Sequence, residues 1–168
     1  LPLPDEYASE YERVAALAAA AKAKGQEVVV VMGVGFVGAV MAAIIADATD
    51  ESGRSNKFVI GCQRPSTRSF WKIPLLNRGM SPVRAEDPEV DIIISRCVNK
   101  KKTLIATYNS DCLALADCVV VDVQCDYLKQ SLGDMRTGEV EMTALEATMR
   151  TIGQKVPAHC LVMIETTV

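Results

Sequence analysis

Residues 28–38 have the sequence VVVVMGVGFVG. The apolar run ends in the pattern Gly-x-Gly-x-x-Gly, and a second apolar segment, AVMAAIIA, continues over residues 39–46. This combination is typical of a buried parallel strand that turns tightly into a helix. The glycine pattern by itself occurs often by chance, so the strand before it and the helix after it carry the prediction.

The three glycines of this pattern have separate physical roles. Gly33 permits the sharp turn after the strand, Gly35 lets the backbone approach phosphate oxygens, and Gly38 lets the helix pack closely on the strand. The free N–H groups and the positive dipole end of the helix then face an anion. The stretch therefore predicts a site for the pyrophosphate of a dinucleotide.

The same stretch leaves two other interpretations open. Residues 28–46 are uncharged, mostly apolar and long enough to span a bilayer, and a strand–turn–helix can also form without a ligand. Three closely spaced glycines suit a turn better than a membrane-spanning helix. The acidic flanks, Glu27 and Asp47, and the lack of a second such segment in the sequence also favour a protein without a membrane partner.

The composition indicates a globular domain. The 168 residues are 49% hydrophobic and 23% charged, which suits one domain with a sizeable core. The net charge is −3, and the one lysine run, Asn99–Lys102, is expected to be a solvated loop. Because no basic block is dense enough to follow a phosphate backbone, we expect no nucleic-acid partner.

Cysteine and histidine usage favours a reduced compartment and no metal site. The six cysteines form no Cys-x-x-Cys pair, and several lie in apolar runs, where a thiol acts as a small buried hydrophobe. The only histidine, His159, has no ligand partner at metal spacing. No signal peptide is visible. We therefore expect a cytoplasmic protein with reduced thiols.

The apolar segments predict alternating strands and helices. We expect helices over 5–24, 36–48, 88–98 and 138–153, helical turns over 66–76 and 110–116, and strands over 28–32, 57–62, 103–107, 118–123 and 160–165. This order predicts an α/β fold of the Rossmann type, a doubly wound, mainly parallel sheet with helices on both faces. The carboxyl ends of the strands would share one edge, where ligands bind.

We expect two parts along the chain, an N-terminal helix in residues 1–26 and a dinucleotide-binding domain in residues 27–168. The chain starts at Leu1 rather than Met, and it stops at Val168 just after an apolar run. We therefore expect the domain to be a fragment of a longer enzyme.

The end of the second predicted strand departs from a simple NAD site. An Asp or Glu usually accepts hydrogen bonds from the adenosine ribose at this point, but this chain has Gln63. Arg64 and Arg68 follow, and they could meet a ribose 2′-phosphate, lie along the adenine or the diphosphate, or remain solvated. The missing acid counts against the simplest NAD site, and the residues at this point do not exclude NADP.

Four ordered segments carry a family resemblance. They are VMGVGFVG at 31–38, VIGCQ at 59–63 with LNRGMSP at 76–82, ADCVVVDV at 116–123, and ETTV at 165–168. In these segments the chain resembles the N-terminal NAD-binding domain of the UDP-glucose/GDP-mannose dehydrogenase family, the nucleotide-sugar dehydrogenases. The family's patterns are V-x-G-x-G-Y-V-G, V-x-G-x-D with L-N-x-G-x-x-P, A-D-x-x-x-I-x-V and S-T-V. The N-terminal helix lies outside the resemblance.

The resemblance implies cofactor contacts where the motifs match. These positions are Gly33, Gly35, Phe36, Val37, Gly38, Arg68 and Thr167. At two places the chain departs from the motifs, because Gln63 replaces the family's acid and Cys125-Asp126 replaces its Thr-Pro pair. Both departures concern groups near the cofactor, and so they bear on its affinity and on the choice between NAD and NADP.

A polar cluster follows the strand predicted over 118–123. Val123, Gln124 and Cys125 are expected as cofactor contacts at the carboxyl edge of the sheet, where a nicotinamide or a substrate would lie. We expect Asp122 to be a buried hydrogen-bonding carboxylate or a helix cap rather than a general base. Cys125 has no His or Lys nearby in the sequence to activate it, so we assign no catalytic residue within the chain.

The resemblance also implies a function for the intact enzyme. It would oxidise the primary alcohol of a UDP- or GDP-sugar to a uronic acid in two NAD-dependent steps, through a thioester on a cysteine, as part of polysaccharide biosynthesis. In the family that cysteine and the sugar pocket belong to later domains, so this chain alone is expected to be inactive, and a homo-oligomer is expected at full length. The alternative is a non-catalytic dinucleotide-sensing or assembly module, because fold alone does not determine function.

Overall fold

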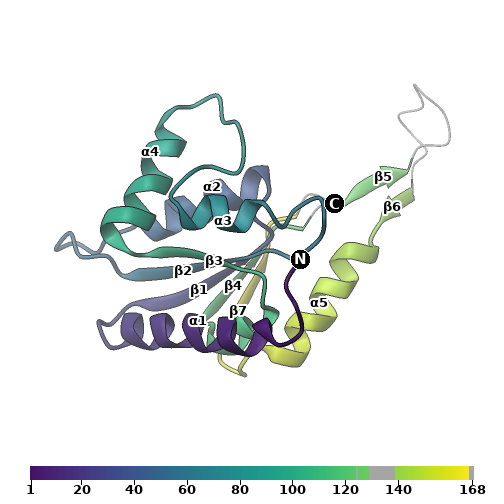
Figure 1. Ribbon diagram of the computed structural model, residues 1–168, viewed down its shortest axis with the longest axis horizontal. Helices are drawn as coiled ribbons and strands as arrows, with labels where there is room; N and C mark the ends of the chain where they lie inside the picture. Colours follow the sequence, from purple (N-terminus) through teal and green to yellow (C-terminus); the bar gives the residue numbers. More distant parts are fainter. Residues whose placement is uncertain (124, 129–138, 167–168) are drawn as a thin grey trace.

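A five-stranded parallel sheet forms the centre of the computed structural model, which describes residues 1–123, 125–128 and 139–166 (Figure 1). Its strands are β1 (Glu27–Met32), β2 (Lys57–Cys62), β3 (Leu104–Thr107), β4 (Cys118–Val121) and β7 (Leu161–Ile164). They lie in the order β3-β2-β1-β4-β7, and all four pairings are parallel. The order reverses between β1 and β4, and such a switch point opens a crevice at the carboxyl ends of the strands.

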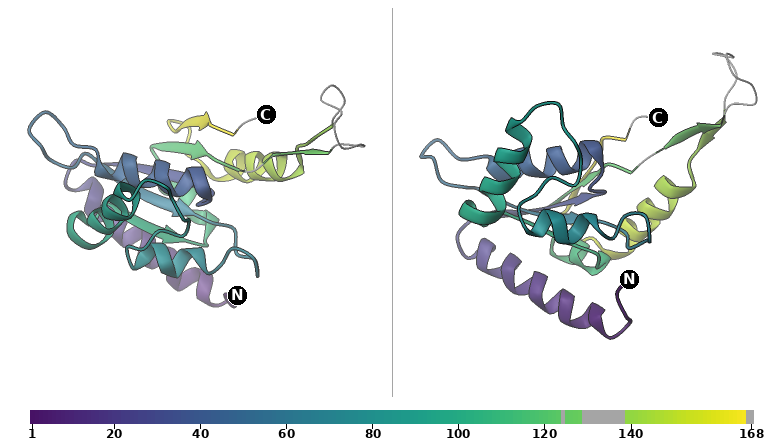
Figure 2. Two further views of the ribbon diagram at one scale, coloured as in Figure 1. Left: turned by 90° about the horizontal axis from the view of Figure 1, so that it is seen from above. Right: turned by 45° about the horizontal axis from the view of Figure 1, so that its top comes forward.

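Helices cover both faces of the sheet (Figures 1 and 2). One face carries α1 (Glu6–Lys22), the 3₁₀ helix η2 (Ser110–Leu115) and α5 (Thr143–Lys155). The other face carries α2 (Phe36–Asp47), α3 (Lys72–Asn77), α4 (Glu89–Ser95) and the π-helix η1 (Arg96–Lys101) that continues α4. The predicted fold class, a Rossmann-type sheet covered on both faces and preceded by a helix, is confirmed.

The central strand β1 explains why its sequence is a continuous apolar run. Successive side chains of a strand point to opposite faces, and both faces of this sheet are covered. Val28 and Val30 therefore pack in the core beneath α1 and α5, whereas Val29 and Val31 pack in the core beneath α2. All four valines are buried.

The N-terminal helix α1 packs directly on the sheet. Its buried side chains, Val14, Ala18 and Ala21, belong to the same core cluster as Val28 and Val30. Burial of these apolar side chains stabilises the helix on the sheet far more than the intrinsic propensity of an isolated helix could.

Small residues let α2 lie close to the sheet. Its buried positions are Gly38, Ala39, Ala42, Ala43 and Ala46. The apolar stretch 28–46 is divided between β1 and α2, with a turn between them, so it is not one helix. Among the residues that the structure describes, no helix combines the length and the apolar character that crossing a bilayer requires.

Most elements agree with the sequence prediction, but three segments differ. The lysine run Asn99–Lys102 was expected to be a solvated loop, but most of it belongs to η1. A helix was expected from residue 138, but β6 (Glu139–Glu141) pairs there with β5 (Asp126–Leu128) as an antiparallel hairpin. Val140 stands between two glutamates, and this alternation suits a strand. The helix α5 begins only at Thr143, whose N–H donates to the carboxylate of Glu141 at 2.9 Å. Residues 66–76 are also less helical than expected, since α3 starts at Lys72.

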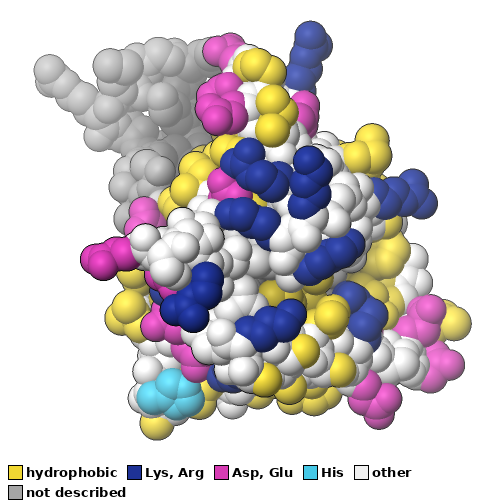
Figure 3. Space-filling view, turned by 90° about the vertical axis from the view of Figure 1, so that its left-hand side faces the viewer, with side chains coloured by type: hydrophobic (Ala, Val, Ile, Leu, Met, Phe, Trp, Pro, Cys, Tyr) yellow, Lys and Arg dark blue, Asp and Glu magenta, His cyan; other side chains and the backbone are white. Residues whose placement is uncertain are grey.

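The amino ends of the strands carry many Lys and Arg side chains, interspersed with acidic ones (Figure 3). Lys57 pairs with Glu27 at 2.5 Å, and Lys101 pairs with Asp47 at 2.8 Å. Asp47 also accepts two hydrogen bonds from Arg96, at 2.9 and 2.5 Å. The carboxylate of Asp47 thus joins the end of α2 to η1.

Acid is expected to weaken the contact at Asp47. Hydrogen bonds from Arg96 hold the pKa of this carboxyl well below its usual range; partial burial raises it, and Lys101 lowers it further. Because the folded-state pKa lies below the unfolded value, the stabilisation is present above about pH 4 and is lost as the pH falls toward the folded pKa. Urea unfolding at neutral and at acid pH should show a smaller acid-induced loss of stability in Asp47→Asn than in the natural chain. Equal losses in the two proteins would contradict this assignment.

Candidate functional site

A cleft of about 840 Å³ lies at the carboxyl ends of the strands. It is bordered by the turn between β1 and α2, the ends of β2 and β4, one side of α5 and the first turn of α1. Most of the predicted cofactor contacts line it, namely Gly33, Gly35, Phe36, Val37, Gln63, Arg64, Arg68, Val123 and Cys125. Segments far apart in the sequence therefore meet at one edge of the sheet.

Three predicted contacts are not among the described residues of the cleft. Gln124 and Thr167 lie outside the residues that the structure describes. Gly38 is buried behind the turn, on the side of α2 that faces the end of β4.

The structure itself requires glycine at two of the three motif positions. Gly33 has a φ of +97°, and a Cβ there would lie 2.1 Å from the backbone oxygen of Asp122. A Cβ on Gly38 would lie 2.0 Å from the backbone oxygen of Gly33. Both contacts are closer than atoms can approach, so the turn and the helix–strand packing depend on these glycines.

Gly35 differs from the other two glycines. Its φ of −80° and ψ of −156° suit any residue, and no protein atom lies within 4 Å of the place where a Cβ would stand. The fold therefore gives no reason for glycine at this position. A ligand that approaches the backbone closely would give one.

The N terminus of α2 presents N–H groups beside Gly35 that make no hydrogen bond within the helix. The first helical hydrogen bond runs from the N–H of Ala39 to the oxygen of Gly35, at 3.1 Å. The N–H groups of Phe36 and Val37 precede it and have no partner within the helix. Together with the positive end of the helix dipole, they make this turn suitable for an anion.

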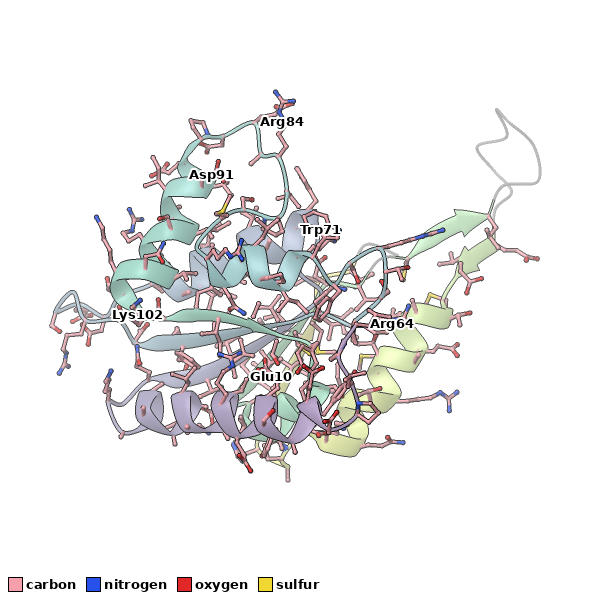
Figure 4. The ribbon with its side chains drawn as sticks, in the orientation of Figure 1. Glu10, Arg64, Trp71, Arg84, Asp91 and Lys102 are labelled. Atoms are coloured by element: carbon pink, nitrogen blue, oxygen red, sulfur yellow. The ribbon has the colours of Figure 1, made fainter. Side chains whose placement is uncertain are left out.

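The charged side chains among the described residues of the cleft are three cations and one acid. Arg64, Arg68 and Lys72 lie on the side of β2 and α3, and Figure 4 shows Arg64 at the carboxyl end of the sheet. Asp122 lies at the end of β4, where burial raises the pKa of its carboxyl and the N–H of Gly38 lowers it, with a net increase. The balance of charge favours an anionic ligand.

Gln63 stabilises the glycine turn. Its side-chain oxygen accepts the N–H of Val34 at 3.0 Å, and its backbone N–H donates to the oxygen of Thr107 at 2.9 Å. The side-chain NH₂ donates one N–H to the backbone oxygen of Arg64 at 3.4 Å, which leaves its second N–H as a donor for a ligand in the cleft. Gln63 would present a ribose with a donor where an Asp or Glu would present acceptors.

The ends of β4 and β7 are joined by Thr166. Its hydroxyl accepts the N–H of Val123 at 3.1 Å and donates to the oxygen of Val121 at 3.3 Å. Cys125 lines the cleft close by, whereas His159 lies beside Asp117 at the amino ends of these strands, 3.4 Å from its carboxylate. Within the described part of the chain, His, Cys, Asp and Glu form no cluster of three or more that could hold a metal ion.

Several lining residues were not predicted from the sequence. They include Tyr7, Ser69, Lys72, Tyr108, Thr148, Thr151 and Thr166. Thr148 and Thr151 are three positions apart and so share one face of α5, which is a signal that the sequence did contain. Tyr7 had no such signal, because it lies in a helix outside the glycine motif and the resemblance.

Solved structures of dehydrogenases are similar to this chain. NDP-N-acetyl-D-galactosaminuronic acid dehydrogenase from Methanosarcina mazei Go1 has 28% sequence identity and a TM-score of 0.71 over 92% of this chain. UDP-D-ManNAc dehydrogenase from Pyrococcus horikoshii has 24% identity and a TM-score of 0.64 over 84% of the chain. GDP-mannose dehydrogenase from Pseudomonas aeruginosa has 23% identity and a TM-score of 0.61 over 83% of the chain.

The predicted resemblance to the nucleotide-sugar dehydrogenases is confirmed by the first of these structures. At 24% and 23% identity the second and third support the fold alone, whereas the first is more similar in sequence. The chain spans 30%, 28% and 28% of the lengths of the three proteins, respectively. No family model and no curated protein sequence matches the chain.

Proposed function

We propose that this chain is the cofactor-binding domain of a nucleotide-sugar dehydrogenase and that it binds a nicotinamide dinucleotide in the cleft. The observation that carries the proposal is Gly35, which the fold does not require and which stands open to the cleft at the N terminus of α2. The N–H groups of Phe36 and Val37 would hold the diphosphate. Bound there, a nicotinamide supplies a hydride acceptor for the oxidation of an alcohol.

The other cleft residues divide between the two halves of such a ligand. The adenosine half would lie toward the end of β2, near Gln63 and Arg64, because that strand end normally meets the ribose. The nicotinamide half would lie across the switch point, near Val123, Cys125 and Thr166, which line the cleft at the ends of β4 and β7. Thr166 holds the backbone there by accepting the N–H of Val123.

For the intact enzyme we propose the oxidation of the primary alcohol of a UDP- or GDP-sugar to a uronic acid, with NAD as the cofactor and a role in polysaccharide biosynthesis. The chain spans about 30% of the Methanosarcina enzyme, and this supports a cofactor-binding part whose sugar-binding and catalytic residues lie elsewhere. We also propose that the intact enzyme is a cytoplasmic homo-oligomer without a nucleic-acid or membrane partner.

Calorimetry with NAD and with NADP tests the proposal directly. We expect weak binding of both, in the millimolar range of affinity, because the carboxylate that normally holds the ribose is replaced by Gln63. Folded protein that gives no heat of binding with either dinucleotide at millimolar concentration would contradict the proposed function.

Gln63 is expected to leave NAD and NADP poorly distinguished, with affinities within about tenfold of each other. Gln63→Glu keeps the side-chain length, so its carboxylate can still accept the N–H of Val34 while it attracts a free ribose diol and repels a 2′-phosphate. We expect this variant, and Gln63→Asp, to shift the affinity ratio toward NAD by about tenfold, or ~1.4 kcal/mol.

A matched control for this change is Gln154→Glu, which alters charge in the same way at an exposed position of α5 outside the cleft lining. Its ratio of NAD to NADP affinity should equal that of the natural chain. An unchanged ratio in both Gln63 variants would show that residue 63 does not face the ribose.

A further inference from the structure

The first turns of α1 are bonded to the carboxyl end of β3. The hydroxyl of Thr107 donates to the carboxylate of Glu10 at 2.6 Å, and the side-chain NH₂ of Asn109 donates to the backbone oxygen of Tyr7 at 2.7 Å. Arg13 holds the same carboxylate of Glu10 through two hydrogen bonds of 2.8 Å. Thr107 and Asn109 are buried. The helix is therefore held at this edge of the sheet by specific polar contacts as well as by apolar packing.

The charge on Glu10 strengthens this attachment. Burial raises the pKa of its carboxyl, but hydrogen bonds from Arg13 and Thr107 outweigh the burial, and the net pKa is lowered. Glu10 is therefore ionised at neutral pH, and charge-assisted hydrogen bonds are stronger than neutral ones. Figure 4 shows Glu10 on the side of α1 that faces the sheet.

The attachment brings an aromatic pair to the cleft. Tyr7 and Tyr108 pack edge to face, with ring centroids 5.1 Å apart and planes at 79°. Phe70 packs behind Tyr108 with its centroid 5.9 Å away, and the hydroxyl of Tyr108 donates to the backbone oxygen of Glu6 at 3.2 Å. Both tyrosines line the cleft. They form an aromatic wall on the side of β2 and β3.

The order of the strands places this wall beside one end of the expected ligand. The diphosphate position is the N terminus of α2, after β1, and the ribose position is the end of β2. Because β3 is the next strand outward, a base attached to that ribose extends toward Tyr7 and Tyr108. An aromatic face there can stack on a base.

We infer that α1 is part of the cofactor site and that Tyr7 contacts the adenine ring of the bound dinucleotide. The inference rests on the proposed function and adds to it a binding residue from a helix that precedes the glycine motif. The match with the Methanosarcina structure covers 92% of the chain, which is more than residues 27–168 alone would provide. Part of the N-terminal segment therefore has a counterpart in that dehydrogenase.

Binding measurements on Tyr7 variants test the inference. Calorimetric titrations would use NAD, ADP-ribose, which carries the adenine, and nicotinamide mononucleotide, which lacks it. We expect Tyr7→Leu, which keeps apolar bulk but removes the aromatic face, to lower the affinity for NAD and for ADP-ribose by about tenfold. Tyr7→Phe keeps the ring and should retain binding. Nicotinamide mononucleotide should bind all three proteins equally.

Tyr11→Ala is the matched control, because Tyr11 lies one turn further along α1 and is not among the described residues of the cleft. It should leave every affinity unchanged. Unchanged NAD and ADP-ribose affinity in Tyr7→Leu would overturn the inference while the proposed function stands. An equal loss of affinity for nicotinamide mononucleotide in Tyr7→Leu would also overturn the inference, since Tyr7 would then act through the fold. Failure of the natural chain to bind NAD or ADP-ribose would overturn the proposed function and this inference together.

Discussion

Gly35→Asp is expected to abolish dinucleotide binding and to leave the fold intact. The backbone at Gly35 has dihedral angles that any residue adopts, and a Cβ there meets no protein atom within 4 Å. Aspartate is also a favoured residue at a helix N-cap, where its carboxylate accepts N–H groups of the first turn. In this position it would occupy the place of the diphosphate and repel it.

In this variant the NAD affinity and the free energy of unfolding are expected to change by different amounts. We expect the affinity for NAD to fall by at least about tenfold, while the free energy of unfolding stays the same or rises by roughly a few tenths of a kcal/mol from the new cap. Gly35→Ser caps the helix without a charge, so it should weaken binding less than the aspartate does. Calorimetry and urea unfolding measure the two effects. If the Gly35→Asp variant bound NAD as tightly as the natural chain, the ligand would not lie over residue 35.

Gly38→Ala is expected to have the opposite effect, a large loss of stability. The added Cβ would lie 2.0 Å from the backbone oxygen of Gly33 and 2.7 Å from the Oδ2 of Asp122. Relief of these contacts requires α2 to move away from the sheet, and this disturbs the buried side chains of Ala39, Ala42, Ala43 and Ala46. Overpacking at such a contact costs about 3 kcal/mol.

Gly153→Ala is the matched control for Gly38→Ala, because Gly153 is also helical but a Cβ there meets no atom within 4 Å. It should stabilise the protein by about 0.5–1 kcal/mol, since alanine restricts the unfolded chain more than glycine does. Thermal unfolding should show a midpoint lowered by about 6–12 °C in Gly38→Ala and slightly raised in Gly153→Ala. Similar midpoints for the two variants would mean that α2 tolerates a larger distance from the sheet.

Much of the fold could be predicted because its signals are local. The apolar run of β1 and the glycine turn after it depend on residues that are neighbours in the sequence, and β2 was predicted at the bounds that the structure shows. The hairpin of β5 and β6 was missed because each strand has only three residues. So short a strand is defined by its partner rather than by its own periodicity.

The candidate site was predictable only in part, because only some of its residues are marked by local signals in the sequence. The motif positions from Gly33 to Val37 and the residues from Gln63 to Arg68 follow strand ends, and the parallel topology brings strand ends together. Their actual partners did not follow from the pattern. For example, no local pattern shows that the side-chain oxygen of Gln63 accepts the N–H of Val34.

The sequence by itself determined the alternation of strands and helices and the turn at Gly33, because steric limits on the backbone and apolar periodicity act between near neighbours in the chain. Only the tertiary structure decided that Tyr7 belongs to the cleft. Its backbone oxygen is bonded to Asn109, 102 positions away, and its ring packs on Tyr108. Such a contact depends on how α1 docks on the sheet, through burial of Val14 and Ala18 and the bonds of Glu10, and no local pattern in the sequence encodes that geometry.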